Sequence, residues 1–318
     1  MTQIVNLKQI KEICRKIDFA PLIEEGFAAY SDGRVVVPPV GEMSFSAPPG
    51  DTHIKYGYIK DDDSFVVKIA SGFYDNPKRG LPSNSGLMLV FSQHTGLLQT
   101  VLLDEGYLTD VRTAVAGRIA AKYLASSELE AIGILGTGIQ ARLQVLQLRT
   151  LTRCRQLVAW GRSEKSLEAY RDALEQEGFS VVTTTEAEEL TAVCNLIVTA
   201  TPSAMPLLFA DQIRPGTHIT AVGSDTPRKQ ELDPDILAKA DLVVADSIPQ
   251  CLERGEIAKA IGAGTLNRDQ VVELGKIVSG RVQGRTAKDQ ITVADLTGVA
   301  VQDIQIAKAV CAGLENED

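Results

Sequence analysis

The feature that most constrains the fold is a glycine-rich turn that follows directly on a short apolar segment. The apolar segment runs from Ile132 to Leu135, and the motif GTGIQA occupies positions 136–141. The first glycine permits a tight turn, the second lets a pyrophosphate approach the backbone, and the alanine lets the following helix pack on the strand. The unpaired N–H groups at the start of that helix attract phosphate oxygens. We therefore predict a dinucleotide-binding turn whose contacts are Gly136, Thr137, Gly138, Ile139 and Gln140.

Apolar and helical segments alternate around this turn. The apolar segments span 131–135, 156–160, 196–200, 218–222 and 241–245, and the helical segments span 140–150, 163–177, 186–194 and 234–239. Alternation of this kind is typical of parallel strands that are joined by right-handed crossovers. The sequence therefore predicts an α/β protein with a Rossmann-type, doubly wound parallel sheet, built from about residues 126–296.

The N-terminal part has a different pattern. Helices are expected at 7–17 and 21–30, and segments of alternating polarity at 52–60, 64–71, 86–92 and 97–103 predict an antiparallel or mixed sheet. An alanine-rich helix at 109–125 connects this part to the middle of the chain. The amphipathic helix at 297–314 belongs either to the middle domain or to the first one. We expect two domains, the first of them of the α+β class.

Composition narrows the class of protein further. The 318 residues are 44% hydrophobic and 23% charged, which is typical of a globular protein and not of a disordered one. The net charge of −9 argues against nucleic acid or an anionic membrane as a partner. No apolar run is long enough to span a bilayer, and no secretory signal is visible. Five scattered cysteines and three separate histidines favour a cytoplasmic protein without a metal site.

The choice of dinucleotide depends on the end of the second predicted strand. An acidic residue there would bond the ribose 2′-hydroxyl of NAD, but the chain has Gly161, Arg162 and Ser163 after Trp160. Arg162 and the Ser163 hydroxyl suit a 2′-phosphate, so we expect NADP(H), with NAD(H) as the alternative. On the simpler interpretation, Arg162 faces solvent and Ser163 caps the next helix. Thr201, after the strand at 196–200, either contacts the ribose or nicotinamide or ends a turn.

Four further polar residues have positions that suit chemistry. Lys68 lies within an apolar strand, where it either faces water or holds a carboxylate or moves a proton, and Lys55 has the same ambiguity. Arg112 lies in the first turn of a helix, which suits a substrate carboxylate or a structural salt bridge. Asp225 follows the strand at 218–222, where it could exchange a proton with a nitrogen or cap a turn.

Together these segments resemble the ornithine cyclodeaminase/mu-crystallin family over nearly the whole chain. The matching stretches are 67–68, 108–114, 136–141, 223–225, 230–233, 245–247 and 296–303. The resemblance implies a two-domain homodimer, in which residues 1–125 and 297–318 bind substrate and dimerise and residues 126–296 bind the dinucleotide. It implies that Lys68 and Arg112 grip an α-amino or α-imino acid, and that Asp225 acts as proton donor or base beside the nicotinamide.

Two details of the resemblance favour one branch of the family. The tip at 161–163 resembles that of NADPH-binding ketimine reductases, and the stretch 68–77 resembles a branch with reductases of Δ1-pyrroline-2-carboxylate. In the resemblance, many members carry a substrate-binding arginine where this chain has Val40, so that contact is either missing here or supplied by another residue such as Lys55. Glu42 is the only nearby acid for a distal amine, which weighs against ornithine as substrate.

The expected function is NAD(P)H-dependent reduction of a cyclic ketimine carboxylate. Substrates of this class are Δ1-pyrroline-2-carboxylate and Δ1-piperideine-2-carboxylate, and the products are L-proline and L-pipecolate. Lys68, Arg112 and Asp225 are expected to converge on the nicotinamide. The alternatives are an ammonia-releasing, NAD-dependent cyclodeaminase, an alanine-type dehydrogenase that reduces an acyclic imine, and a binding protein without activity.

Overall fold

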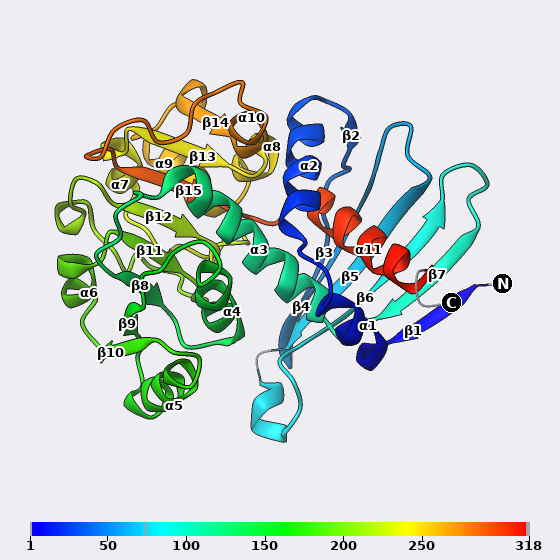
Figure 1. The fold of residues 1–318 in the computed structure, drawn as a ribbon, viewed down its shortest axis with the longest axis horizontal. Helices are drawn as coiled ribbons and strands as arrows, with labels where there is room; N and C mark the ends of the chain where they lie inside the picture. The colour runs from blue at the N-terminus through cyan, green and yellow to red at the C-terminus, as the bar shows by residue number, and fades with distance from the viewer. Residues whose placement is uncertain (1, 74, 316–318) are drawn as a thin grey trace. The chain divides into compact units, whose positions relative to one another are not determined.

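The computed structural model describes residues 2–73 and 75–315, and it divides into two compact units (Figure 1). Unit 1 comprises Met1–Arg112 and Val299–Asp318, and unit 2 comprises Thr113–Gly298. The sequence placed these boundaries at 125/126 and 296/297. The observed boundary between Arg112 and Thr113 lies inside helix α3 (Tyr107–Leu124). The units are therefore divided there by their tertiary contacts and not by a loop. None of the helices in the described part has the length and apolarity of a membrane span.

Unit 1 is built on a mixed sheet. Within the described residues it has seven strands in the order β1-β7-β6-β5-β4-β2, with β3 paired to β4. The strands are β1 (Gln3–Asn6), β2 (Val35–Val36), β3 (Gly41–Ser46), β4 (Pro49–Ile59), β5 (Ser64–Phe73), β6 (Asn84–Ser92) and β7 (Leu98–Leu103). Neighbouring strands are antiparallel except for β1, which lies parallel to β7. The four strands expected from alternating polarity correspond to β4 to β7.

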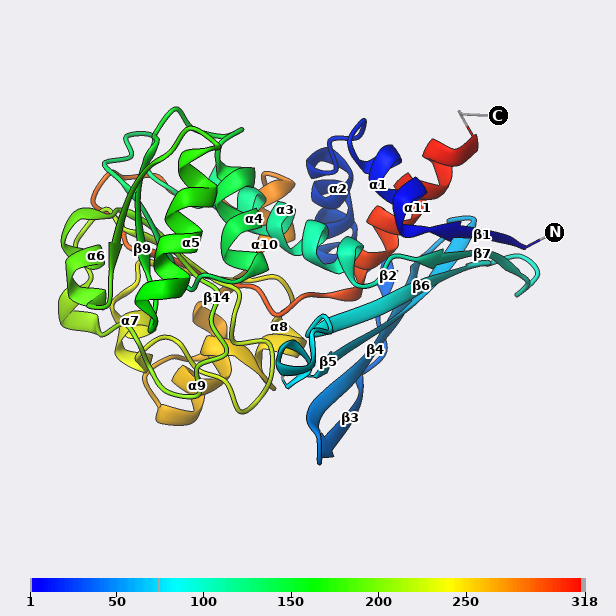
Figure 2. The ribbon, with the colours of Figure 1, turned by 90° about the horizontal axis from the view of Figure 1, so that it is seen from below.

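Three helices cover one face of this sheet, as Figure 2 shows. They are α1 (Leu7–Cys14), α2 (Ala20–Ser31) and α11 (Ala300–Glu315). The last helix packs on α2, β4 and β5, so the C-terminal segment returns to the first unit. Lys55 and Lys68 are register partners on β4 and β5, and both are buried. Directly opposed residues of antiparallel strands point to the same face, so the two lysines lie side by side.

The other face of the sheet carries aromatic side chains. Tyr58, Phe65 and Phe91 are successive register partners on β4, β5 and β6, and we call them the aromatic row. The rings of Phe65 and Phe91 stack with their centroids 4.8 Å apart, and Tyr58 is 37% exposed. An apolar face of this kind is typical of an interaction surface.

Unit 2 is a Rossmann-type fold. Its described residues form an eight-stranded sheet, parallel throughout, in the order β10-β9-β8-β11-β12-β15-β13-β14. The first five strands have the 3-2-1-4-5 order of the dinucleotide-binding fold. The strands are β8 (Ile132–Leu135), β9 (Gln156–Trp160), β10 (Ser180–Thr184), β11 (Leu196–Thr199), β12 (His218–Ala221), β13 (Leu242–Ala245), β14 (Val271–Glu273) and β15 (Thr292–Asp295).

Helices connect most of these strands, as the alternation predicted. They are α4 (Ile139–Leu148), α5 (Glu164–Glu175), α6 (Ala187–Val193), α7 (Pro234–Lys239), α8 (Ile248–Cys251), α9 (Gly255–Ala263) and α10 (Leu274–Val278). Strands β8, β11, β12 and β15 are buried along their whole length. Strands β8 and β11 are apolar almost throughout, whereas β12 and β15 also bury polar side chains. Ligands bind such sheets at the carboxyl ends of the strands.

Candidate active site

The glycine turn has the geometry that a phosphate group requires. Gly136 has a φ of +115°, and a Cβ atom there would lie 2.7 Å from the carbonyl oxygen of Ala200. Only glycine therefore fits this position. Gly138 is the N-cap residue of α4 and provides no side-chain cap, and a Cβ built on it meets nothing within 4 Å. The space beside Gly138 is therefore open, which allows a pyrophosphate to approach the start of the helix.

A cavity of about 230 Å³ lies beside this turn within unit 2. Its volume is below the roughly 300–1,000 Å³ of a complete ligand pocket, so it fits one part of a dinucleotide. Most of the predicted cofactor contacts line this cavity. Ser163 does not line it and instead caps α5 by accepting a hydrogen bond from Ser166 N at 3.4 Å. Ile139 is exposed in the first turn of α4. The lining residues are Gly136, Thr137, Gly138, Trp160, Gly161, Arg162, Ala200, Thr201, Pro202, Ser203 and Leu207.

Behind the wall of this cavity lies a fully buried carboxylate, Glu231. Its Oε1 accepts hydrogen bonds from Thr201 N at 2.6 Å and Thr201 Oγ1 at 2.7 Å. Its Oε2 accepts from Thr199 Oγ1 at 2.8 Å and Gly223 N at 2.9 Å. Burial raises the pKa of Glu231 to about 7, although these hydrogen bonds act to lower it. Because Thr201 donates its hydroxyl hydrogen to Glu231, the same hydroxyl can only accept from a ligand.

Asp225 lies at the same carboxyl edge of the sheet, after β12. Its Oδ1 is 2.6 Å from the Nζ of Lys229, and its side chain is 47% exposed. Ser224 Oγ donates to the carbonyl oxygen of Lys229 at 2.9 Å, which closes the turn. Asp225 is therefore one half of an ion pair in a tight turn and remains accessible to solvent.

Unit 1 holds a second group of predicted site residues, which meet at Asp303 of α11. Lys68 Nζ lies 3.2 Å from Asp303 Oδ2, and Arg112 Nε donates to Asp303 Oδ1 at 3.0 Å. Arg112 also donates from Nη1 to Gln302 Oε1 at 2.9 Å. The exposed fractions of Lys68, Arg112 and Asp303 are 2%, 4% and 1%. Lys68 is thus not a lysine that faces water. We call Lys55, Lys68, Arg112 and Asp303 the cation cluster.

The electrostatics of the cation cluster favour an anion. Burial lowers the pKa of Lys68 to about 8, while Asp303 raises it and Arg112 lowers it further. Burial alone would raise the pKa of Asp303, but Arg112, Lys68 and Lys55 together hold it below its usual value. Arg112, Lys68 and Lys55 therefore all act on the ionised carboxylate of Asp303, while a second buried acid, Asp104, acts on Lys68. The cluster as a whole is positive and suits the carboxylate of a substrate.

Sequence patterns did not assign roles to Asp303, Gln302 and Glu231. All three lie in stretches that matched the family motifs, and their burial was not visible from those stretches. For Gln302 and Asp303 the available signal was a polar side chain within an otherwise apolar helix, because such residues are rarely buried without a partner. Glu231 lies in a polar stretch, after Lys229 and Gln230, which gives no such signal.

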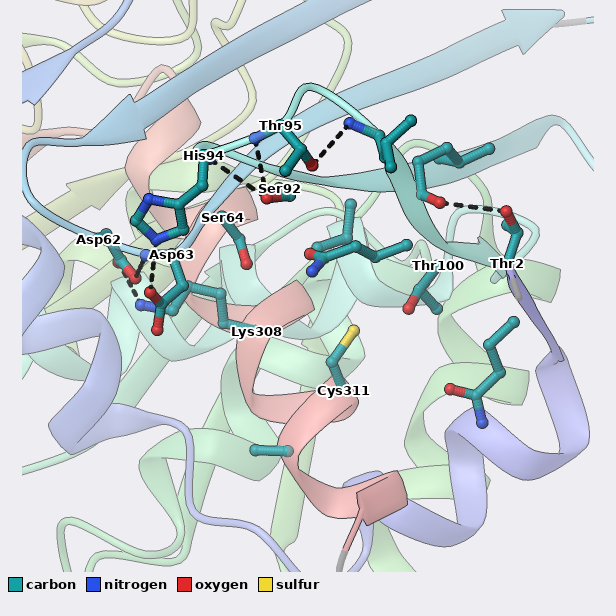
Figure 3. Close-up of a pocket in the computed structure, with 16 residues that line it drawn as sticks. Thr2, Asp62, Asp63, Ser64, Ser92, His94, Thr95, Thr100, Lys308 and Cys311 are labelled. Carbon is teal, nitrogen blue, oxygen red and sulfur yellow. Dashed lines mark hydrogen bonds and ion pairs between the residues drawn. The ribbon is translucent and has the colours of Figure 1, made fainter.

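A larger cavity of about 1270 Å³ lies at another place in unit 1 (Figure 3). Its charged groups pair with one another: Lys308 with Asp62, and His94 Nε2 with Asp63 Oδ1 at 3.0 Å. Ser92 Oγ accepts from the backbone N–H of His94 at 3.2 Å. Because these charges are compensated locally, the cavity gives no signal for a particular ligand.

The family model for the ornithine cyclodeaminase/mu-crystallin family matches residues 1–317. The chain belongs to this family. It is 41% identical to the uncharacterized cyclodeaminase y4tK of Sinorhizobium fredii over 294 residues, which are 92% of this chain and 89% of that protein. Its membership confirms the resemblance that the sequence motifs indicated.

Two solved structures of the family place the chain among oxidoreductases. An archaeal alanine dehydrogenase dimer with bound NAD is 32% identical and superposes with a TM-score of 0.91, over 99% of this chain and 97% of that one. The Thermococcus litoralis Δ1-pyrroline-2-carboxylate reductase in complex with NADH and L-proline is 25% identical, with a TM-score of 0.92 over 99% and 98%. These neighbours confirm the Rossmann-type fold class, and the chain is an enzyme of the oxidoreductase class.

Val40 and Glu42 are the two positions at which the resemblance led us to expect a departure in the binding of substrate. Val40, where an arginine was expected, precedes β3, and Glu42 is an exposed residue on β3. Lys55, by contrast, is buried beside Lys68, and its charge acts on Asp303. The cation cluster therefore contains a third cation besides Lys68 and Arg112.

Proposed function

We propose that the enzyme reduces a cyclic ketimine carboxylate with NAD(P)H, giving an L-imino acid such as proline or pipecolate. The observation that carries the proposal is the buried, net positive cation cluster in a family member with an open glycine turn. It is supported by the structural similarity to a Δ1-pyrroline-2-carboxylate reductase that binds NADH and L-proline.

In this proposal the cation cluster holds the substrate carboxylate. The guanidinium of Arg112 has five N–H donors in a planar fork, of which Nε serves Asp303 and one Nη1 hydrogen serves Gln302. Asp303 fixes the fork and also neutralises part of the charge of Lys68. The preorganised cations then bind and orient a carboxylate without rearranging, which lowers the entropic cost of reaching a reactive geometry.

The bound dinucleotide would supply a hydride to the imine carbon. The residues of the glycine turn, with Gly136, Gly138 and the start of α4, would hold its phosphates. Asp225 in its protonated form, or a water molecule that its carboxylate orients, would deliver a proton to the imine nitrogen. Arg162 lines the cavity and would bind a 2′-phosphate, which supports NADP(H), whereas the two solved relatives contain NAD or NADH.

A second candidate is an alanine-type dehydrogenase that reduces an acyclic imine. The similarity to the archaeal alanine dehydrogenase favours it. The cation cluster would hold the carboxylate of either substrate, so the two candidates differ in what surrounds the imine carbon. A cyclodeaminase is less well supported because Glu42, the acid expected to hold a distal amine, is an exposed residue of β3.

We also propose that the enzyme is a homodimer that buries the aromatic row. Helices cover the opposite face of this sheet, whereas Tyr58 remains more than one-third exposed. Burial of such a face against a second copy is favourable because it removes apolar surface from water. The archaeal alanine dehydrogenase of known structure is a dimer.

The decisive experiment is an assay of the purified protein with matched substrates. Consumption of NADPH or NADH is followed by absorbance with Δ1-pyrroline-2-carboxylate, Δ1-piperideine-2-carboxylate, or pyruvate plus ammonia. L-Ornithine with NAD⁺ is run beside them with ammonia detection. We expect the highest kcat/KM with a cyclic ketimine. Ammonia release from ornithine without net cofactor reduction, or a preference for pyruvate plus ammonia, would contradict the proposal.

Two variants connect the activity to the cation cluster. Arg112→Ala should raise the KM for the imine about a hundredfold, because a buried charged contact to the carboxylate is lost. Lys122→Ala removes an exposed cation from the same helix, α3, and should leave the KM unchanged. An equal KM for the wild type and Arg112→Ala would remove Arg112 from substrate binding.

A further inference from the structure

Glu231 contacts two loops that the proposed function uses for different purposes. Its carboxylate accepts hydrogen bonds from the backbone N–H groups of Thr201 and Gly223. Thr201 lies in the wall of the cavity beside the glycine turn. Gly223 lies two positions before Asp225, at the start of the turn that contains the proposed proton donor. One side chain therefore links the ends of β11 and β12.

The two loops touch each other at the same point. A Cβ atom on Gly223 would lie 2.3 Å from the carbonyl oxygen of Thr201 and 2.4 Å from Glu231 Oε2. The neighbouring Gln230 donates its backbone N–H to the carbonyl oxygen of Ser203 at 2.8 Å, and Ser203 also lines the cavity. The segment around Glu231 thus supports the cavity wall at both Thr201 and Ser203.

We propose that Glu231 is a positioning residue that holds the cavity wall at 200–203 and the Asp225 turn in one fixed arrangement. The proposal rests on the proposed function in one respect, because it takes the cavity to bind the dinucleotide. Glu231 itself is fully buried and acts through Thr201 and Gly223. It is therefore distinct from the residues predicted to contact the cofactor or the substrate.

The pattern of donors requires a carboxylate at this position. All four hydrogen bonds to the Glu231 carboxylate come from N–H or O–H groups, and the two backbone N–H groups contact different oxygens. Glutamine has one oxygen and one NH₂ group, so either of its orientations places an NH₂ group against the N–H of Thr201 or Gly223. A buried N–H group without an acceptor is unfavourable, so the loop has to move.

The main test measures dinucleotide affinity, which is independent of turnover. The dissociation constants of NADPH and NADH are measured by fluorescence for the wild type and Glu231→Gln, together with the melting temperature. We expect Kd to rise roughly tenfold for the better-bound nucleotide in Glu231→Gln, because the displaced loop lines the cavity. The KM for the imine should change much less than Kd.

A matched control lies at the other end of the same strand. Asn195 precedes β11 and accepts a hydrogen bond from Glu130 N at 3.0 Å and donates one to Glu128 O at 2.9 Å. Asn195→Ala should lower the melting temperature but leave Kd unchanged. Equal Kd values for Glu231→Gln and the wild type would overturn the proposal. A Kd that rises equally in both variants would also overturn it, because the role of Glu231 would then be structural only.

A milder variant keeps the proposal testable if Glu231→Gln does not fold. Thr199→Val removes one donor to Oε2 and preserves the side-chain shape, and we expect Kd to rise about two- to threefold. An unchanged Kd in Thr199→Val would then count as refutation. If the wild type binds neither nucleotide, both the proposed function and this inference are wrong. If the wild type binds a nucleotide and the variants bind it equally well, only this inference is wrong.

Discussion

The exchange Asp303→Asn tests whether the cation cluster is held together by a single buried charge. Asp303 contacts both Lys68 and Arg112, and all three side chains are at most 5% exposed. Removing one partner of a buried ion pair costs about 3–5 kcal/mol, because the remaining charge stays desolvated. For a unit of this size each kcal/mol lowers the melting temperature by roughly 3 °C, so we expect a decrease of about 10–15 °C near neutral pH.

The pH dependence provides a sharper form of the same test. The pKa of Lys68 is about 8 in the folded protein, against 10.5 as its ordinary value. Between these values the unfolded chain binds more protons, so the Lys68 contribution makes the free energy of unfolding rise as the pH increases from about 8 to 10.5. The decrease in the free energy of unfolding caused by Asp303→Asn should therefore be smaller at high pH, where Lys68 is uncharged, than at neutral pH.

The assay is thermal unfolding followed by circular dichroism across this pH range. Asp62→Asn is the control, since Asp62 pairs with Lys308 of the same helix, α11, but is partly exposed. Loss of the ion pair between Asp62 and Lys308 should lower the free energy of unfolding by only about 0–1 kcal/mol. Lys68→Met introduced together with Asp303→Asn should recover part of the stability. A melting temperature of Asp303→Asn within about 2 °C of the wild type at neutral pH would refute the reasoning.

Three further predictions concern the reaction, the cofactor and the assembly. Asp225→Asn should lower turnover by about a hundredfold or more, as for a lost acid–base group, with an unchanged Kd for the dinucleotide; unchanged turnover would exclude Asp225 from proton transfer. Arg162→Ala should raise the Kd of NADPH about tenfold and leave that of NADH unchanged, and an equal effect on both would argue against a contact to the 2′-phosphate. Tyr58→Lys should shift the protein from dimer to monomer in light scattering, because it would bury a charge, whereas a stable dimer would place the interface elsewhere.

The fold of unit 2 was predictable because its signals are local. The apolar segment at 156–160 coincides with β9, and the helical pattern at 234–239 coincides with α7. Strand β15 was not predicted, since Thr292 and Asp295 interrupt its apolar character. Both are buried because they have distant partners: Thr292 Oγ1 donates to Leu124 O at 2.9 Å, and Asp295 Oδ2 accepts from Ile257 N at 2.8 Å.

The candidate site was predictable to the extent that its residues belong to short motifs. The spacing of Gly136 and Gly138 in the motif identified both, and in the structure Gly136 is crowded and Gly138 is open. The burial of Lys68 could not be predicted, because a strand lysine that faces water has the same sequence pattern as a buried one. Its environment depends on Asp303, which is contributed by the last helix of the chain. Glu231 was missed for the same reason, since the four donors to its carboxylate come from the last residue of β11 and from the loops after β11 and β12.

The return of α11 to unit 1 has a consequence for how the polypeptide is made. A ribosome releases the segments with Lys68 and Arg112 long before it synthesises Asp303. In the nascent chain these two cations lack their counter-ion, and the sheet lacks the helix that packs on β4 and β5. Unit 1 can complete its core only after the whole of unit 2 has been translated. Proteolytic removal of α11 would then leave the sheet of unit 2 intact but would remove Asp303 from unit 1.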